Sequence, residues 1–169
     1  MSNFPSLQPA MTVLVTLGDI SPVGSASRGT PLAIAAMVDG SVKSEPGFTP
    51  AIDAAWVGQG ADYIHNDPSG KQMRLNAHAV VKDKSGALVY LSYSGVVDIT
   101  PEVGLVLGGS PDAKTTAFGN SFIEMKFETG DENLKGLETG VFVGAGRFVA
   151  EKGKPIVVEY KISKAIKGN

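Results

Sequence analysis

One stretch of the sequence carries polar side chains that could handle protons. In residues 74–82 apolar and polar residues alternate, which is typical of a β-strand, and Arg74, Asn76 and His78 fall on one face. A histidine titrates near neutral pH and can act as a general acid or base. If this face lines a pocket, we expect His78 to transfer a proton while Asn76 and Arg74 bind the substrate and stabilise an oxyanion. If the face meets water, these residues form the solvated side of an amphipathic strand, and the sequence alone favours this second interpretation.

Two aspartates are further candidates. Asp53 stands among apolar residues in 51–56, where burial would raise the pKa of its carboxyl and make it a proton donor or acceptor. The alternative is an exposed residue on an edge strand. Asp62 lies in the run 60–63 and is a candidate for substrate binding. Alternatively it caps a turn through backbone hydrogen bonds, and the sequence favours this turn.

Aromatic residues could shape a pocket around these groups. Trp56 and Tyr90 are the candidates for cavity walls, although most aromatic residues of a barrel belong to its core. The sequence has no cysteine and two histidines, whose spacing matches no zinc motif, so we expect no metal. The Gly-Ala-Gly run at 144–146 lies in a strand pattern with no helix after it. The dinucleotide fingerprint therefore fails, and we expect no cofactor.

The elements that would hold these residues are short strands. Strands are predicted by alternating or bracketed apolar residues at 11–17, 32–42, 51–57, 74–82, 87–97, 120–128, 141–149 and 156–162. Residues 83–86 form a hairpin turn, residues 19–31 form a long loop, and Thr100 begins a short helix that ends at Gly108. About eight strands with one or two short helices predict an all-β, antiparallel, up-and-down (calycin-like) barrel, which is filled by side chains or holds one small ligand.

The composition indicates one intracellular domain. We expect an N-terminal arm at 1–10, a barrel domain at 11–163 and a C-terminal tail at 164–169. The sequence has 15 basic and 17 acidic residues, and the basic residues form no stripe. Nucleic acid is therefore not an expected partner. Without cysteine, a signal peptide or a long apolar run, the chain is expected to be cytoplasmic and not bound to a membrane. Apolar residues on the second faces of several strands favour a homo-oligomer.

Five short runs resemble one known family. They are GADY at 60–63, DPSG at 67–70, DKSGALVYL at 83–91, FETGD at 127–131 and FVGAGR at 142–147. In this order they resemble a family of small β-barrel proteins from bacteria and fungi, known as domain of unknown function 3237 or uncharacterised protein family 0311. The resemblance covers residues 11–163 and is to a fungal-like member. It implies a barrel fold and no particular activity.

The sequence departs from this family in two places. Family members often carry an Asp-Ala-Arg-Tyr run where this chain has Asn-Ala-His-Ala at 76–79. If the Asp and Arg of the family do chemistry, this chain uses different groups there. The segment 43–50 is also longer than in the shorter bacterial members.

Together these features predict a barrel that encloses a small, largely apolar organic molecule. We expect a cofactor-independent isomerisation, cyclisation or elimination by acid–base catalysis, with His78 and Asp53 transferring protons. Two alternatives stay open: a lipocalin-like ligand-binding protein without chemistry, and a structural or oligomerising barrel. The choice depends on which strand faces turn inward, because a shift of one residue moves His78 from the pocket to the solvent.

Overall fold

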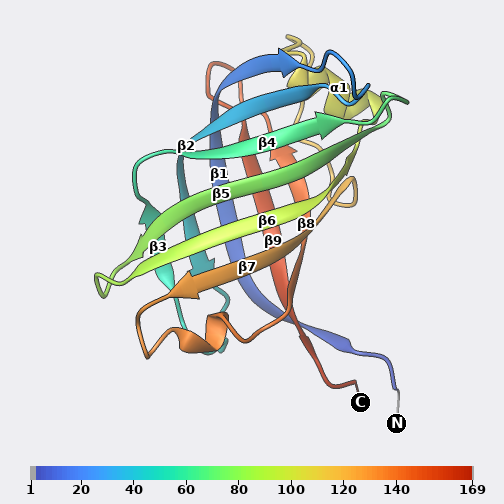
Figure 1. Cartoon of the computed structure of the whole chain (residues 1–169). Helices are drawn as coiled ribbons and strands as arrows, with labels where there is room; N and C mark the ends of the chain where they lie inside the picture. The colour runs from blue at the N-terminus through green and yellow to red at the C-terminus, as the bar shows by residue number, and fades with distance from the viewer. Residues whose placement is uncertain (1–2, 169) are drawn as a thin grey trace.

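The computed structural model describes residues 3–168. Most of its secondary structure is β-strand, formed where apolar and polar residues alternate. The elements are β1 (Ser6–Gly24), β2 (Leu32–Ser44), β3 (Asp53–Trp56), β4 (Gly60–Asn66), β5 (Gln72–Asp83), β6 (Leu88–Asp98), α1 (Pro101–Leu107), β7 (Ser121–Thr129), the 3-10 helix η1 (Lys135–Leu137), β8 (Phe142–Val149) and β9 (Val157–Ile166). All strand pairs are antiparallel, and β1 pairs with β2 on one side and with β9 on the other (Figure 1). The sheet therefore closes, which confirms the predicted all-β barrel.

Two short strands share one place in the ring. β2 pairs with β4 through residues 32–37 and with β3 through residues 41–43. On its other side, β5 also pairs with both β3 and β4. β3 and β4 are thus two halves of one strand position, so the nine strands fill eight positions around the barrel. A ring of this size has room for side chains or for one small ligand.

The inward and outward faces follow the hydrophobic period. On β5 the residues Leu75, Ala77 and Val81 are buried in the barrel, and His78 belongs to the alternate, outward set. On β7 every second residue from Ser121 to Phe127 is buried in the same way. On β5 this is the arrangement that the sequence favoured, in which Arg74, Asn76 and His78 form the solvated side of an amphipathic strand.

The two ends of the barrel are closed differently. At the α1 end, the Thr100 hydroxyl accepts a hydrogen bond from the Val103 N–H (3.3 Å), and α1 buries Val103 and Val106 in the core. The predicted helix start is therefore confirmed. At the η1 end, the Phe142 ring meets the rings of Phe48 and Phe127 edge-on, with centroids 6.2 and 5.4 Å away. This aromatic cluster fills the interior at the η1 end.

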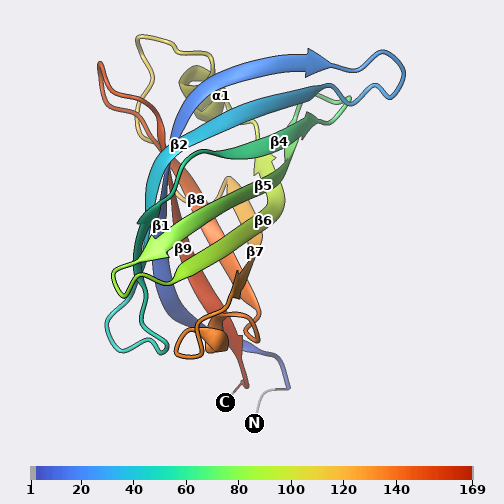
Figure 2. The same cartoon turned by 60° about the vertical axis from the view of Figure 1, so that its left-hand side comes forward.

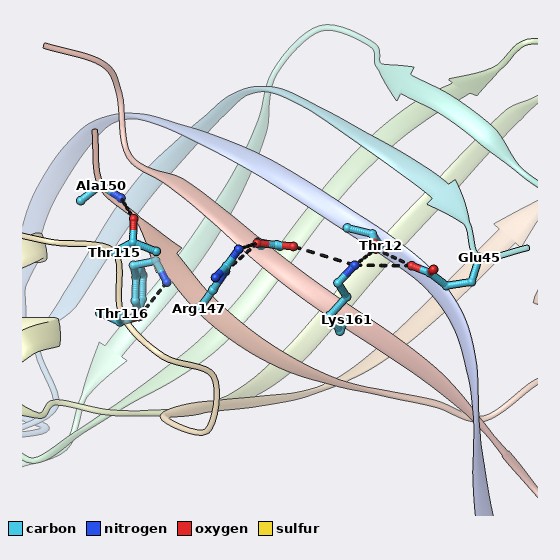
Figure 3. Close-up of polar contacts among 9 residues, drawn as sticks. Thr12, Glu45, Thr115, Thr116, Arg147, Ala150 and Lys161 are labelled. Carbon is cyan, nitrogen blue, oxygen red and sulfur yellow. Dashed lines mark hydrogen bonds and ion pairs between the residues drawn. The ribbon is translucent and has the colours of Figure 1, made fainter. Parts of the chain in front are cut away.

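The long segment between α1 and β7 is fastened to the end of β8. Thr116 Oγ1 accepts a hydrogen bond from the Phe148 N–H (3.0 Å), and the Thr116 N–H donates to the Phe148 carbonyl (2.9 Å). Next to it, Thr115 Oγ1 accepts a hydrogen bond from the Ala150 N–H at 3.1 Å (Figure 3). These three bonds hold the segment that follows α1 against the barrel wall, and so keep α1 over its end.

Charged and polar side chains on the outer face of β8, β9 and β1 pair with one another. Arg147 Nη2 lies 2.6 Å from Glu159 Oε2, and Lys161 Nζ lies 3.5 Å from Glu45 Oε1. Thr12 links the second pair, because its hydroxyl accepts from Lys161 (2.6 Å) and donates to Glu45 (2.7 Å) (Figure 3). The Lys161–Glu45 pair is partly exposed, and ion pairs between exposed side chains contribute only about 0–1 kcal/mol to stability.

β1 is longer at both ends than the predicted strand at 11–17. Residues 20–24 pair with residues 32–35 of β2, so the first part of the predicted loop at 19–31 is strand. Figure 2 shows this part of the β1–β2 hairpin extending beyond the ring. At the other end, Ser6 faces Ile166 of β9, so the predicted arm and tail both contain paired residues. Residues 19–23 of β1 are all exposed, so this stretch has no buried face to give a periodic apolar pattern.

Both helices of the described chain, α1 and η1, are too short to cross a membrane.

Candidate functional site

The barrel contains a small apolar cavity near its α1 end. Its volume is about 180 Å³, somewhat above the roughly 150 Å³ of an engineered cavity that binds benzene. Leu17 of β1 and Ala35 of β2 line one side, and Leu107 of α1 lies at the end. Asp62 is its one acidic lining residue, and the described lining includes no Lys, Arg or His.

Asp62 points into the barrel from β4 and is 5% exposed. The pairing of β4 with β5 is interrupted between the Asp62–Ala77 and His65–Arg74 pairs. In this gap the Asp62 carboxylate takes over a role that a strand carbonyl normally has: its Oδ1 accepts the Asn76 N–H at 2.9 Å. The backbone therefore holds one carboxylate oxygen, and Oδ2 has no hydrogen-bond partner among residues 3–168.

Burial makes this carboxyl a weaker acid than usual. It raises the pKa of Asp62 from 3.8 to about 6, and the hydrogen bond from the Asn76 N–H opposes the rise only in part. No ion pair of the described residues involves Asp62. At neutral pH the cavity therefore holds a carboxylate that is mostly ionised and can accept a proton.

Two buried tyrosines line the same cavity. The rings of Tyr93 on β6 and Tyr160 on β9 have centroids 5.2 Å apart, and the Tyr93 hydroxyl donates to Met37 Sδ at 3.5 Å. Burial is the main cause that raises the pKa of both phenols, and the negative charge of Asp62 adds to it. Both hydroxyls therefore stay protonated. The Tyr93 hydroxyl can donate to a ligand in place of its contact with Met37 Sδ, which is a weak acceptor.

Gly146 on β8 leaves room for the Tyr160 ring. A Cβ atom at this position would lie 2.6 Å from the ring, much closer than atoms of this kind approach. A glycine inside a strand allows the strand to bend. The structure adds that Gly146 sets the position of a cavity wall.

Replacing Gly146 with alanine is expected to destabilise the protein by about 1–3 kcal/mol, because the added methyl group overpacks the interior. The Tyr160 ring must move, so binding of benzene to the cavity should weaken as well. Urea unfolding with and without benzene measures both effects. Gly104→Ala in α1 is the matched control: its Cβ meets nothing within 4 Å, and it should stabilise the helix by about 0.5–1 kcal/mol. A Gly146→Ala variant as stable as the wild type would contradict this view of the wall.

Three of the residues predicted from the sequence meet on the outer face. His78 Nδ1 lies 2.6 Å from the Tyr90 hydroxyl, and His78 Nε2 lies 3.0 Å from Asn76 Oδ1. An amide oxygen only accepts, so this arrangement places the ring proton on Nε2 and makes Nδ1 the acceptor for Tyr90. The structure therefore brings His78, Asn76 and Tyr90 together, but on the side of the sheet away from the cavity.

The other predicted residues are dispersed. Arg74 Nη2 pairs with Asp67 Oδ2 at 2.8 Å, and Asp53 pairs with Lys84, both on the surface. Trp56 packs at the position where Gly40 has no side chain, outside the cavity lining. His78 and Asp53 share no contact, and the catalytic roles expected for them stay predictions. Of the predicted set, Asp62 alone lines the cavity.

The turn that the sequence favoured for Asp62 is not formed, because residues 60–66 are the strand β4. The pattern of this strand is unusual. Asp62, Ile64 and Asn66 of β4 line the cavity, while Tyr63 and His65 alternate with them. Two of the three inward residues are polar, so the usual apolar period is lost. Tyr160 was detectable, because it shares a predicted strand face with Val158 and Ile162, but no signal in the sequence connected it with Asp62.

No cluster of His, Asp and Glu that could hold a metal ion occurs within residues 3–168.

The closed ring and its cavity define the class of this protein: a small antiparallel β-barrel with an apolar chamber that carries one buried acid. Residues 5–165 match the family described as "Protein of unknown function (DUF3237)", and the chain belongs to this family. The resemblance found in the five sequence runs is thereby confirmed, while a fungal-like origin stays a prediction. Among curated proteins, none matches this chain.

Solved structures share the fold over almost their whole length. A conserved protein of unknown function from Rhodopseudomonas palustris is 22% identical, with a TM-score of 0.74 over 98% of this chain and 100% of its own. A β-barrel-like protein from Acinetobacter baumannii is 20% identical, with a TM-score of 0.73 over 98% and 99%. An enzyme from Penicillium herquei is 15% identical, with a TM-score of 0.65 over 98% of both chains. At these identities the likeness concerns the fold.

Proposed function

We propose that the barrel binds a small, largely apolar organic molecule in its cavity and that Asp62 exchanges a proton with it. The observation that carries this proposal is a buried carboxylate without a counter-charge, at the wall of an apolar chamber, close enough to two phenols to raise their pKa values. Buried titratable groups with shifted pKa values in a pocket are typical of proton-transfer sites. The enzyme from Penicillium herquei gives a precedent for catalysis on this fold.

The reaction class that these groups serve is an isomerisation, a cyclisation or an elimination without a cofactor. The Asp62 carboxylate takes a proton from a carbon or oxygen of the ligand, and the electron pair left behind moves to an oxygen of the same molecule. The Tyr93 and Tyr160 hydroxyls donate hydrogen bonds to that oxygen. Asp62 then returns the proton at another atom, which gives the isomer or the ring-closed product, or it protonates a leaving group.

A second function, ligand binding without chemistry, is favoured by the apolar walls. A carrier needs the cavity and gains nothing from proton transfer, so it should retain its ligand when Asp62 is replaced. Asp62→Asn separates the two functions, because the amide keeps the shape of the side chain and an oxygen for the Asn76 N–H, but it is no base.

The isomerisation of 3-cyclohexen-1-one to its conjugated isomer tests the proposal. This ketone is ring-sized and releases an α-proton, so we expect the protein to accelerate its conversion, with a rate that rises with pH and levels off above about 6 as Asp62 ionises. Asp62→Asn should lower the accelerated rate by about 100-fold or more. Ultraviolet absorbance of the conjugated product measures the rate.

The exposed Asp112→Asn serves as the matched control and should retain the wild-type rate. Replacing His78 with alanine tests the outer-face prediction in the same assay: a loss there would move the chemistry to the outer face. A wild-type protein that binds the ketone without accelerating its conversion would favour the carrier.

A further inference from the structure

We propose that the cavity selects ligands that carry a protonated amine on an apolar body. This inference rests on the proposed function in one respect, that the chamber beside Asp62 is a ligand site. It goes further by assigning the charge of the ligand. Three properties of the chamber carry it: an unbalanced carboxylate, aromatic walls, and the absence of positive side chains from the described lining.

The first of these properties is the unbalanced charge of the Asp62 carboxylate. The groups that face Asp62 are the Asn76 N–H from β5 and the phenols Tyr93 from β6 and Tyr160 from β9. None of them is positive, and Oδ2 is left without a partner in the described chain. A hydroxyl on a ligand would satisfy Oδ2 and leave the negative charge uncompensated. An ammonium group satisfies the same oxygen and also neutralises the charge, which matters most in an apolar chamber.

The aromatic walls favour the same group. The rings of Tyr93, Tyr160 and Phe148 all line the cavity, on β6, β9 and β8. A cation is attracted to the face of an aromatic ring, and this attraction grows when water is excluded. A carboxylate beside several rings therefore binds ammonium groups through two independent effects, while the remaining apolar walls accept a hydrocarbon body.

The same features exclude anions. A ligand carboxylate or phosphate would meet Asp62 with like charge and would find no Lys, Arg or His in the described lining. The neutral molecules of the proposed function remain compatible, but they should bind less well than amines of the same shape. A bound ammonium also offers Asp62 a proton, and its transfer removes both charges from the apolar chamber.

Three probes of nearly equal shape test the charge preference. Benzylamine is a cation, benzyl alcohol is neutral and benzoate is an anion, and each has a ring that matches a cavity of about 180 Å³. At pH 8, titration calorimetry and thermal unfolding should show benzylamine binding at least about 10-fold more tightly than benzyl alcohol, with no binding of benzoate. The benzylamine affinity should fall as the pH drops below about 6, because Asp62 becomes protonated while the amine stays charged.

Asp62→Asn should abolish the preference and leave the alcohol bound, whereas the exposed Asp112→Asn should keep it. Equal binding of benzylamine and benzyl alcohol, or a preference that survives in Asp62→Asn, overturns the inference. If the alcohol binds and the amine does not, the chamber is a site for neutral molecules, and the proposed function stands without this inference. If none of the probes binds and the ketone is not converted, both fall together.

Discussion

Asp62→Asn is expected to be more stable than the wild-type protein at pH 8, by up to about 3 kcal/mol. The pKa of Asp62 is about 6 in the folded state, whereas the pKa of an aspartate that is not buried is 3.8. A carboxyl whose pKa is raised on folding binds its proton more tightly in the folded state, so its contribution favours folding at low pH. That contribution is lost as the pH rises from about 4 to about 6, and at pH 8 the ionised group destabilises the fold. Each pKa unit corresponds to about 1.4 kcal/mol.

Asparagine removes the charge and retains an oxygen for the Asn76 N–H. Urea unfolding at pH 8 and at pH 4 measures the effect. The two proteins should differ much less at pH 4, where Asp62 is neutral in the folded state and only about half ionised in the unfolded state. Asp112→Asn, on an exposed loop, should change the free energy of unfolding by less than about 0.5 kcal/mol at either pH. An Asp62→Asn variant that is less stable than the wild type at pH 8 would show that the carboxylate has a structural partner, and would weaken its assignment to a ligand.

Phe142→Ala is expected to have the largest destabilising effect, a loss of about 3–5 kcal/mol. The Phe142 side chain is 0% exposed and lies between the rings of Phe48 and Phe127 at the η1 end. Removing it opens a cavity that the rigid strands around it cannot close. Ring pairs in edge-on contact add to the loss beyond the buried area.

The neighbouring strand offers a matched control. Phe122 of β7 lies on the outer face and is 61% exposed, so the same substitution there should change stability by less than about 0.5 kcal/mol. Denaturant unfolding of both variants measures the contrast. Because Phe142 does not line the cavity, binding of the probes should persist in Phe142→Ala wherever the fold persists. Equal effects at 122 and 142 would contradict the packing at the η1 end.

The sequence predicted the ring well because most strands bury one face. Leu75, Ala77 and Val81 alternate with polar residues, and only one of the two faces can form a core. The same period also gave the correct side for His78. The functional hypothesis required the face of β5 that carries His78 to turn inward. Only one face of a strand can turn inward, and on β5 the apolar face fills the barrel.

The candidate site was harder to predict, because it breaks the pattern that reveals the fold. Asp62 occupies an inward position that the hydrophobic period reserves for apolar residues, on a strand whose pairing is interrupted beside it. Local sequence around it therefore favoured a turn. Tyr160 lies about a hundred positions away along the chain, and only the closure of the ring places it near Asp62. Single-sequence patterns report local periodicity and do not report such long-range proximity.

The closure of the ring also has a consequence for how the protein is made. β1 lies between β2 and β9, and the Thr12–Lys161 contact across the β1–β9 pair joins residues 149 positions apart. β1 can pair with β2 soon after both leave the ribosome, but its other edge has no partner until β9 has been synthesised. During that interval an unpaired strand edge is open to pairing with other chains. Among the strands of the barrel, β1 is thus translated first and completes its pairing last.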